Sequence, residues 1–271
     1  MNELFDIKDR VVLVTGSTGV LAGSAADYLA SQGARIVYLG RDREKLDATL
    51  ARCRGHTPAA ECIGLVADVL DRGALERVRT DVIAKWGRID ALLNGAGGNL
   101  PGATIPPDKS FFDLDFDAFR QVVDLNLHGT VLPTLVFTPA MTAGGAIVNF
   151  SSVTVPQAMT RVVGYSAAKA GVDNFTRWLA VDMARRTAGK VRVNAVRPGF
   201  FLGEQNLRLL TNTDGSLTER GRLIIQNTPF GRFGEPAELH GAIHYLISDA
   251  AKFVTGAVFD VDGGFGAFTG V

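Results

Sequence analysis

Short, largely apolar runs rich in β-branched residues recur along the chain, and longer amphipathic segments separate them. The first run reads "VVLVT" at 11–15, and a later one reads "AIVNFS" at 146–151. Runs of this length are typical of parallel strands that are buried on both faces. We therefore predict about seven strands, at 11–15, 35–40, 63–68, 90–95, 146–151, 191–196 and 257–264.

The segments between these runs place apolar residues at the spacing of amphipathic helices. They are 20–32, 42–54, 72–86, 115–137, 163–187 and 236–249. Strands that alternate with helices pair in parallel through right-handed crossovers. The pattern predicts an α/β fold, a Rossmann-type doubly wound parallel β-sheet flanked by helices on both faces. Because no repeat or change of composition divides the chain, we expect one domain over 1–271.

Two regions depart from this alternation. Residues 98–114 are rich in glycine and proline and are predicted to form a loop. Residues 199–229 contain two short helical pieces, near 203–211 and 217–227. Both regions follow predicted strands, and ligands of doubly wound sheets bind beyond the carboxyl ends of the strands. We therefore expect 98–114 and 199–229 to be substrate-site loops or a lid.

Charge and composition exclude several classes of function. Lys plus Arg and Asp plus Glu are both 28, so the net charge is zero, which argues against nucleic acid or an anionic membrane as partner. No apolar run reaches about 18 residues, and "MNELFDIKDR" lacks an apolar signal core. Cys53 and Cys62 give neither a disulfide framework nor a zinc site. We expect a cytoplasmic protein that binds no metal and acts on a small molecule.

The segment "TGSTGVLAG" at 15–23 connects the first predicted strand to the first helix. Glycines in such a turn let the backbone approach a ligand, and the helix start favours a pyrophosphate. The segment lacks the G-x-G-x-x-G spacing, with Ala22 where a glycine is common, so a plain tight turn is the alternative. As a cofactor loop, it would meet the pyrophosphate with Gly16, Ser17, Thr18, Gly19 and Val20.

The end of the second predicted strand bears on the choice of cofactor. An acidic residue there would bind the adenosine ribose and favour NAD, but the chain has Gly40 and Arg41. Arg41 could pair with a 2′-phosphate, so we favour NADP(H) over NAD(H). Asp42 alternatively caps the following helix. Asp68 either meets the adenine amino group or caps a helix.

"SSVTVPQAMTRVVGYSAAKAG" carries the candidate chemistry. Ser152 precedes Tyr165 by thirteen residues, and Lys169 follows Tyr165 by four. On a helix, this last spacing puts both side chains on one face. A nearby ammonium lowers the pKa of a phenol, which can then act as a general acid or base. An ordinary surface pair is the alternative for Tyr165 and Lys169.

The sequence resembles the short-chain dehydrogenase/reductase family, from about residue 8 to the end. The resemblance rests on the order and spacing of several motifs rather than on any single one. These motifs are "TGSTGVLAG", "ADV" at 67–69, "NGAG" at 94–97, "LNLHG" at 125–129, "IVNFSS" at 147–152, "YSAAK" at 165–169, "RVNAVRPG" at 192–199 and "VDGG" at 261–264.

The resemblance implies an NAD(P)-dependent oxidoreductase and a role for each matching residue. Tyr165 would donate a proton to the carbonyl oxygen, which Ser152 would hold by a hydrogen bond. Lys169 would bind the nicotinamide ribose and lower the pKa of Tyr165, and Asn126 would complete a proton relay through a water. Further residues implied to border the cofactor are Asp68, Val69, Asn94, Ala96, Gly97, Pro198 and Gly199.

Two departures from the family pattern bear on the cofactor. Gly95 stands where the family has the second asparagine of its "NNAG" motif, which we expect to loosen a backbone contact. No threonine soon follows Pro198–Gly199, so backbone groups, Glu204, Gln205 or Asn206 would hold the nicotinamide carboxamide.

Within the family, the sequence most resembles a branch that acts on sugar acids. This branch contains D-mannonate oxidoreductases (fructuronate reductases) and the related gluconate 5-dehydrogenases, and the resemblance implies a place in carbohydrate metabolism. Arg161 lies four residues before Tyr165, where a guanidinium could bind a substrate carboxylate by two hydrogen bonds. Asn99 and Gln205 could bind substrate hydroxyls.

Other functions and the assembly stay open at this point. One alternative is a 3-oxoacyl-carrier-protein reductase or a broad-specificity ketone reductase. A catalytically silent nucleotide-sensing protein is a second alternative, against which the complete set of Ser152, Tyr165, Lys169 and Asn126 argues. The resemblance also implies a homotetramer or a dimer.

Overall fold

Seven parallel strands form one sheet in the computed structural model, which describes residues 3–203 and 207–270. Their order is β3-β2-β1-β4-β5-β6-β7, so the direction of winding reverses between β1 and β4. This is the doubly wound arrangement that the alternation of elements predicts. The strands are β1 Val11–Thr15, β2 Arg35–Gly40, β3 Cys62–Val66, β4 Ala91–Asn94, β5 Gly145–Phe150, β6 Val191–Pro198 and β7 Val258–Val261.

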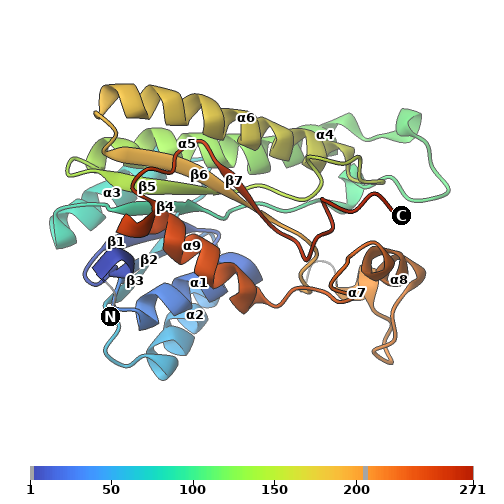
Figure 1. Cartoon of the computed structure of the whole chain (residues 1–271), viewed down its shortest axis with the longest axis horizontal. Coiled ribbons are helices and arrows are strands. Elements are labelled where there is room, and N and C mark those ends of the chain that lie inside the picture. The colour runs from blue at the N-terminus through green and yellow to red at the C-terminus, as the bar shows by residue number, and fades with distance from the viewer. Residues whose placement is uncertain (1–2, 204–206, 271) are drawn as a thin grey trace.

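The sheet is covered by helices on both faces (Figure 1). One apolar cluster joins Val12 and Val14 of β1 to the side that carries α1, α2 and α9. A second cluster joins Val11 and Leu13 to the side that carries α3, α5 and α6. Side chains alternate along a strand, so a run that is apolar throughout packs against both layers. The principal helices are α1 Val20–Ser31, α2 Arg43–His56, α3 Arg72–Trp86, α4 Phe116–Val123, α5 Gly129–Phe137, α6 Val163–Arg186 and α9 His240–Ile247.

The predicted helix 115–137 is interrupted in the structure. A π-helical segment, Asp124–His128, separates α4 from α5. One-residue insertions of this kind occur frequently at functional sites. Asn126 lies inside the segment and is fully buried, so the interruption falls on a candidate catalytic residue.

Other boundaries differ from the predictions by a few residues. The last helix begins as a 3-10 turn, Pro236–Leu239, before α9. The last strand ends at Val261 rather than 264, because Gly263 and Gly264 have φ of 63° and 89°. These angles belong to the left-handed region, which turns the chain out of the sheet.

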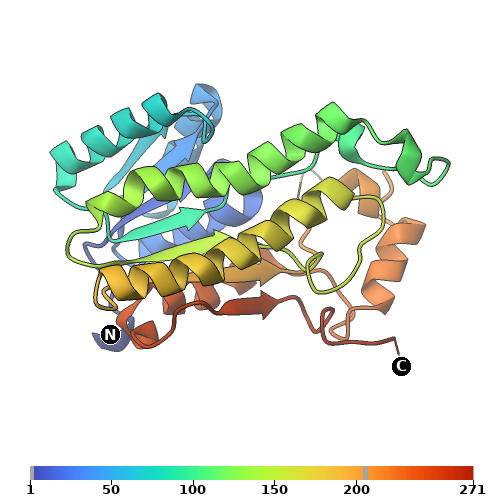
Figure 2. The same cartoon turned by 90° about the horizontal axis from the view of Figure 1, so that it is seen from above.

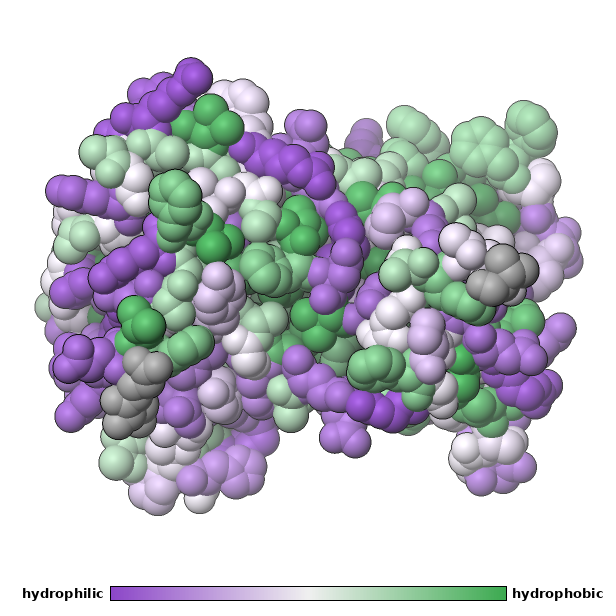
Figure 3. All heavy atoms as spheres, viewed as in Figure 1, coloured by the Kyte–Doolittle hydropathy of each residue, from purple (hydrophilic) through white to green (hydrophobic). Residues whose placement is uncertain are grey.

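Both irregular regions lie beyond the carboxyl ends of the strands (Figures 1 and 2). The 98–114 segment contains only the short turns Pro101–Ala103 and Phe111–Asp113. The 199–229 region contributes α7 Leu207–Leu210 and α8 Glu219–Gln226. Apolar side chains gather on the outer part of the first segment (Figure 3), where Phe112 is 94% exposed.

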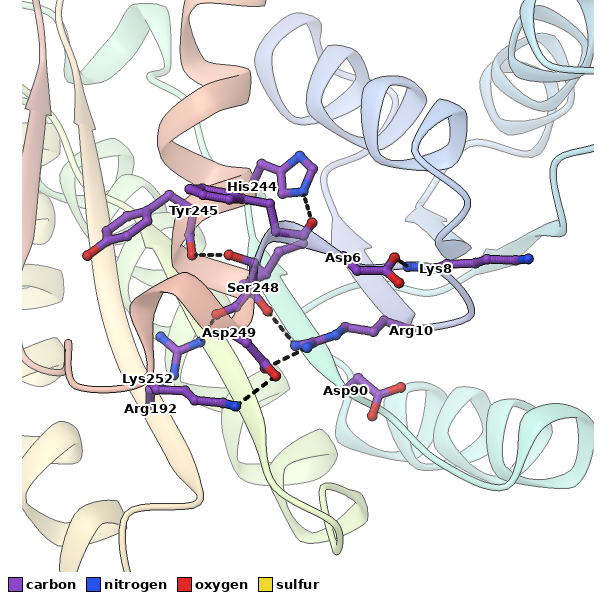
Figure 4. A network of polar contacts seen from close by, with 12 residues as sticks. Asp6, Lys8, Arg10, Asp90, Arg192, His244, Tyr245, Ser248, Asp249 and Lys252 are labelled. Atoms are coloured by element: carbon purple, nitrogen blue, oxygen red, sulfur yellow. Dashed lines mark hydrogen bonds and ion pairs between the residues drawn. The ribbon is translucent and has the colours of Figure 1, made fainter. Parts of the chain in front are cut away.

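The opposite end of the sheet is fastened by a polar network (Figure 4). Arg10 donates to the Ile247 carbonyl at 2.8 Å and pairs with Asp249 at 2.6 Å. Arg192 donates to the Ser248 carbonyl at 3.1 Å. These contacts tie the residues before β1 and the start of β6 to the end of α9. The network therefore lies at the amino ends of the strands, whereas the two irregular regions lie at the carboxyl ends.

Candidate active site

The loop between β1 and α1 has the geometry of an anion cradle. Gly16 has φ of 65°, and a Cβ on it would lie 2.7 Å from the Cα of Ala96, so only glycine fits. Gly19 precedes α1 and gives no side-chain cap, which leaves the first N–H groups of the helix available to a ligand. Val20 begins the helix and is half-exposed beside these groups.

Ser17 and Thr18 serve the sheet as well as the loop. The Ser17 hydroxyl is fully buried and donates to the Leu39 carbonyl at 3.2 Å. Its side chain therefore holds the end of β2, and the contact expected between this loop and the pyrophosphate stays a prediction for the backbone of residues 16–20. The methyl of Thr18 faces Gly40, where a Cβ would lie only 3.1 Å away.

The two departures at Ala22 and Gly95 compensate each other. A Cβ on Gly95 would lie 2.5 Å from the Cβ of Ala22. The alanine methyl thus fills the space that a side chain at 95 would need. The backbone at this point is also not loose, because Gly95 and Ala96 both donate N–H groups to the Thr15 hydroxyl at 3.1 Å. Whether an asparagine at position 95 would add a further contact stays a prediction.

Arg41 and Asp68, which are expected to border the adenosine, form an ion pair at 3.6 Å. The Arg41 side chain is 67% exposed, so a ligand can still reach it. Asp42 caps α2 by accepting from the Lys45 N–H at 3.1 Å, which confirms the alternative given for it. Asp68 accepts from the Leu70 N–H at 2.9 Å and so also orders the turn after β3.

Val69 and Asn94 point into the protein interior. A Cβ on Gly129 would lie 2.9 Å from a Val69 methyl, which shows how closely the two segments pack. Asn94 is buried and donates to the Asn149 side chain at 2.8 Å and to the Thr134 hydroxyl at 2.9 Å. The Asn94 side chain therefore joins β4 to β5 and α5, and Val69 helps to seat α5.

Three segments meet at Gly97. A Cβ on this residue would lie 2.6 Å from Oδ1 of Asn126 and 3.2 Å from Nζ of Lys169. Asn126 accepts from the Gly98 N–H at 3.1 Å and donates to the Gly98 carbonyl at 2.7 Å. The Asn126 side chain thus positions the chain after β4 directly beside the lysine. The proton relay expected of Asn126 stays a prediction.

Tyr165 and Lys169 share a face near the start of α6, as their spacing predicts. The Lys169 Nζ lies 5.5 Å from the centroid of the Tyr165 ring and donates to the Phe150 carbonyl at 2.7 Å. Burial raises the pKa of Tyr165, and a hydrogen bond with Ser152 opposes this rise. The lowering of the Tyr165 pKa expected from Lys169 stays a prediction, because in this structure the ammonium faces the ring and donates to a backbone carbonyl.

The protonation of Lys169 is itself tuned by its surroundings. Burial lowers the pKa of Lys169 to about 8, and the nearby carboxylate of Asp173 opposes this fall. The lysine is therefore largely cationic at neutral pH and becomes neutral above pH 8. Such a shifted group beside a second shifted group is typical of functional sites.

Ser152 lies two residues after the end of β5. It is buried, and its hydroxyl accepts a hydrogen bond from the Thr154 N–H at 3.2 Å. The Tyr165 ring packs with Leu100 against a small cluster that includes Ala103. The 98–114 segment therefore forms a wall beside the phenol. The buried hydroxyl of Thr154 has no hydrogen-bond partner among the described residues. In the sequence, the one signal that could have indicated Thr154 as a site residue is its polar side chain two positions after Ser152.

The sequence motifs do not include Asp173, whose carboxylate lies near the candidate catalytic residue Lys169. It is 2% exposed and accepts hydrogen bonds from the Ser151 hydroxyl and, at 2.6 Å, from Arg197. Arg197 also pairs with Asp260 of β7 at 2.7 Å. Asp173 follows Lys169 by four residues on α6, so helical spacing was the signal that could have found it.

Pro198 and Gly199 turn the chain at the end of β6. The Pro198 carbonyl accepts from Val153 at 3.1 Å, and Gly199 donates to the Val261 carbonyl at 2.9 Å. Four residues later, a Cβ on Gly203 would lie 3.4 Å from a Val20 methyl. The chain after β6 therefore returns toward the start of α1 and lies beside the candidate cofactor loop.

Of the three substrate candidates, two lie among the described residues. Arg161 has φ of 74°, and its carbonyl accepts from the Ile105 N–H at 3.0 Å. Asn99 donates to the Thr104 hydroxyl at 2.8 Å, and its buried Oδ1 has no partner in the described part of the chain. Gln205 lies outside the described residues, as do Glu204 and Asn206.

The residues present fit a nicotinamide dinucleotide. Gly16, Gly19 and the uncapped start of α1 would hold its pyrophosphate, while Arg41 and Asp68 would border its adenosine. Lys169 has a buried ammonium that could bind a ribose hydroxyl. Within 3–203 and 207–270, no group of three His, Cys, Asp or Glu side chains could hold a metal, and no helix could cross a membrane.

The chain is similar to known oxidoreductases over nearly its whole length. A family profile described as enoyl-(acyl carrier protein) reductase matches residues 18–266. The uncharacterized oxidoreductase UxuB of Bacillus subtilis is 40% identical over 98% of both chains.

Two solved structures extend the comparison. One, from Haemophilus influenzae, is described as a D-mannonate oxidoreductase with bound NAD and is 38% identical, with a TM-score of 0.91 over 98% of each chain. The other is a gluconate 5-dehydrogenase from Burkholderia cenocepacia in complex with NADP and tartrate. It is 30% identical, with a TM-score of 0.84 over 98% of each chain.

Proposed function

This chain belongs to the short-chain dehydrogenase/reductase family, and from that premise we propose that it interconverts a ketone and a secondary alcohol on a sugar acid. The substrate would be of the fructuronate/mannonate or ketogluconate type. The observation that carries this proposal is the position of Arg161, a cation beside the catalytic helix. The similarity to a structure described as a D-mannonate oxidoreductase supports it.

The catalytic residues divide the chemistry between them. Bound NAD(P)H supplies the hydride. Tyr165 keeps its proton at neutral pH because burial raises its pKa, and so it can donate that proton to the carbonyl oxygen. Ser152 is hydrogen-bonded to Tyr165 and would hold the same oxygen. Lys169 would bind the ribose as a cation, and Asn126 positions the backbone next to it.

Three polar residues are the candidates for selecting a sugar acid. Arg161 carries a fixed positive charge that can make two hydrogen bonds to a carboxylate. Asn99 has a buried oxygen without a partner among the described residues, which suits a substrate hydroxyl. Gln205 stays a further candidate for a hydroxyl. Polar groups of this kind favour a hydroxylated acid over a long acyl chain.

Nicotinamide absorbance would measure turnover of fructuronate, 5-ketogluconate, a 3-oxoacyl thioester and simple ketones. We expect turnover of a keto sugar acid, and Tyr165→Phe should lower kcat by about 10²- to 10⁴-fold because the proton donor is lost. Binding of the dinucleotide, followed by its fluorescence, should survive this substitution. Turnover of the thioester or of hydrophobic ketones alone would contradict the sugar-acid proposal. An active Tyr165→Phe variant would contradict the role of Tyr165 as proton donor.

We also propose that NADP(H) is preferred over NAD(H). The support is Arg41, an exposed cation at the end of β2, where Asp42 is engaged as a helix cap. The related structures contain NAD in one case and NADP in the other.

Arg41→Ala should therefore raise the KM for NADPH by about tenfold or more and leave the KM for NADH nearly unchanged, since only NADPH carries the 2′-phosphate. Arg43→Ala is the matched control, because Arg43 is also exposed and pairs only with Asp47 in the described structure. Equal losses for the two cofactors in Arg41→Ala would contradict the preference.

A homotetramer, or a dimer, is the assembly that we propose. Its support is an apolar surface on α5 and α6, where Leu135, Trp178 and Val181 are all more than half exposed. A groove of about 790 Å³ runs between these helices. Trp178→Glu should shift the chain to a smaller species in sedimentation velocity, because a buried charge opposes association. A monomeric wild type would contradict the proposal.

The cytoplasmic location and the role in carbohydrate metabolism stay predictions.

A further inference from the structure

Two arginines from distant parts of the chain lie on neighbouring segments, one of which leads into the catalytic helix. Arg220, on α8, donates from Nη1 to the Thr160 hydroxyl at 3.3 Å. Thr160 directly precedes Arg161, which in turn lies four residues before Tyr165. Figure 2 shows α8, in orange, beside the yellow-green segment that leads into α6. A residue from the 199–229 region is thereby placed next to the candidate carboxylate ligand.

These two guanidinium groups lack a counter-ion in the described structure. Neither Arg161 nor Arg220 forms an ion pair with a carboxylate of residues 3–203 or 207–270. Burial lowers the pKa of Arg220, and the positive charge of Arg161 lowers it further. Two half-buried like charges repel each other, so an anion between them would stabilise both.

The backbone at Arg161 is held in an unusual conformation. Its φ of 74° lies in the left-handed region, which costs free energy for a residue other than glycine. The hydrogen bond from Ile105 to the Arg161 carbonyl ties this turn to the 98–114 segment. Strained turns of this kind cluster at ligand sites. The backbone at Arg161 is thus held by a contact with a second segment that borders Tyr165.

We propose that Arg161 and Arg220 together form a subsite for the carboxylate of the substrate, with Thr160 positioning Arg220. This inference rests on the proposed function, since it names how that site would select an acid. Four residues span at most roughly 14 Å. An arginine side chain and a six-carbon keto acid can bridge this separation from Arg161 to the Tyr165 hydroxyl. Recognition by α8 would make this helix the element that separates acids from neutral ketones.

The test compares an acid with a neutral partner of the same shape. Initial rates would be measured with saturating NAD(P)H for a turned-over keto acid and for its methyl ester. Arg220→Met keeps much of the side-chain length and removes the charge. We expect the KM for the acid to rise by about 10- to 100-fold, while its kcat and the KM for the ester change less than about threefold.

The chain offers a matched control on the same helix. Arg222 is exposed and donates to the Leu217 carbonyl at 2.9 Å, without contacting Thr160 or Arg161 in the described structure. Arg222→Met should leave the KM for the acid unchanged. Arg220→Lys should keep part of the affinity, because it restores a charge without the two-pronged geometry. Equal changes for acid and ester in Arg220→Met would mean that Arg220 only packs, and the inference would be overturned.

A binding measurement separates this inference from the proposed function. Tartrate would be titrated into the enzyme–NAD(P)H complex of the wild type, Arg220→Met and Arg222→Met. Weaker binding only in Arg220→Met supports the subsite even if no sugar acid is turned over. Equal binding in all three, or no binding in any, overturns it. Turnover of a sugar acid that Arg220→Met leaves intact would overturn the subsite and leave the proposed function standing.

Discussion

The buried carboxylate of Asp173 is the contact on which the arrangement of the active site depends. It accepts hydrogen bonds from Ser151 at the end of β5 and from Arg197 near the end of β6, and it lies one turn of α6 beyond Lys169. Each of these neighbours is next to a catalytic or cofactor-facing segment. A buried charge that loses a partner costs about 3–5 kcal/mol. The carboxylate therefore fixes three elements relative to one another strongly.

This arrangement also sets the charges of the site. Burial favours the neutral forms of both Tyr165 and Lys169, which raises one pKa and lowers the other. Asp173 works against this effect at Lys169 and favours the charged ammonium. The result is a phenol that retains its proton for donation, next to a cation suited to a ribose.

Much of the fold follows from the sequence, because strands buried on both faces leave a strong hydrophobic pattern. The seven predicted strands and the long helices agree with the structure within a few residues. The hydrophobic pattern of a helix repeats every 3.6 residues and does not reveal one residue inserted into the helix. The π-helical segment around Asn126 was therefore not predictable. The spacing of Tyr165 and Lys169 predicted that both side chains lie on one face of α6. It did not predict that the ammonium donates to the Phe150 carbonyl. Contacts such as Asp173 with Arg197, or Arg220 with Thr160, join residues 24 and 60 positions apart, and no local pattern records them.

The pH profile of kcat/KM for the dinucleotide during carbonyl reduction tests the central role of Asp173 most directly. In the wild type, we expect this value to fall above pH 8, where Lys169 loses its proton. Asp173→Asn removes the negative charge that favours the ammonium, so the fall should begin at a lower pH. Asp182→Asn, on the same helix but in a more exposed pair with Arg186, should match the wild type. A profile of Asp173→Asn that falls at the same pH as the wild type would contradict the account.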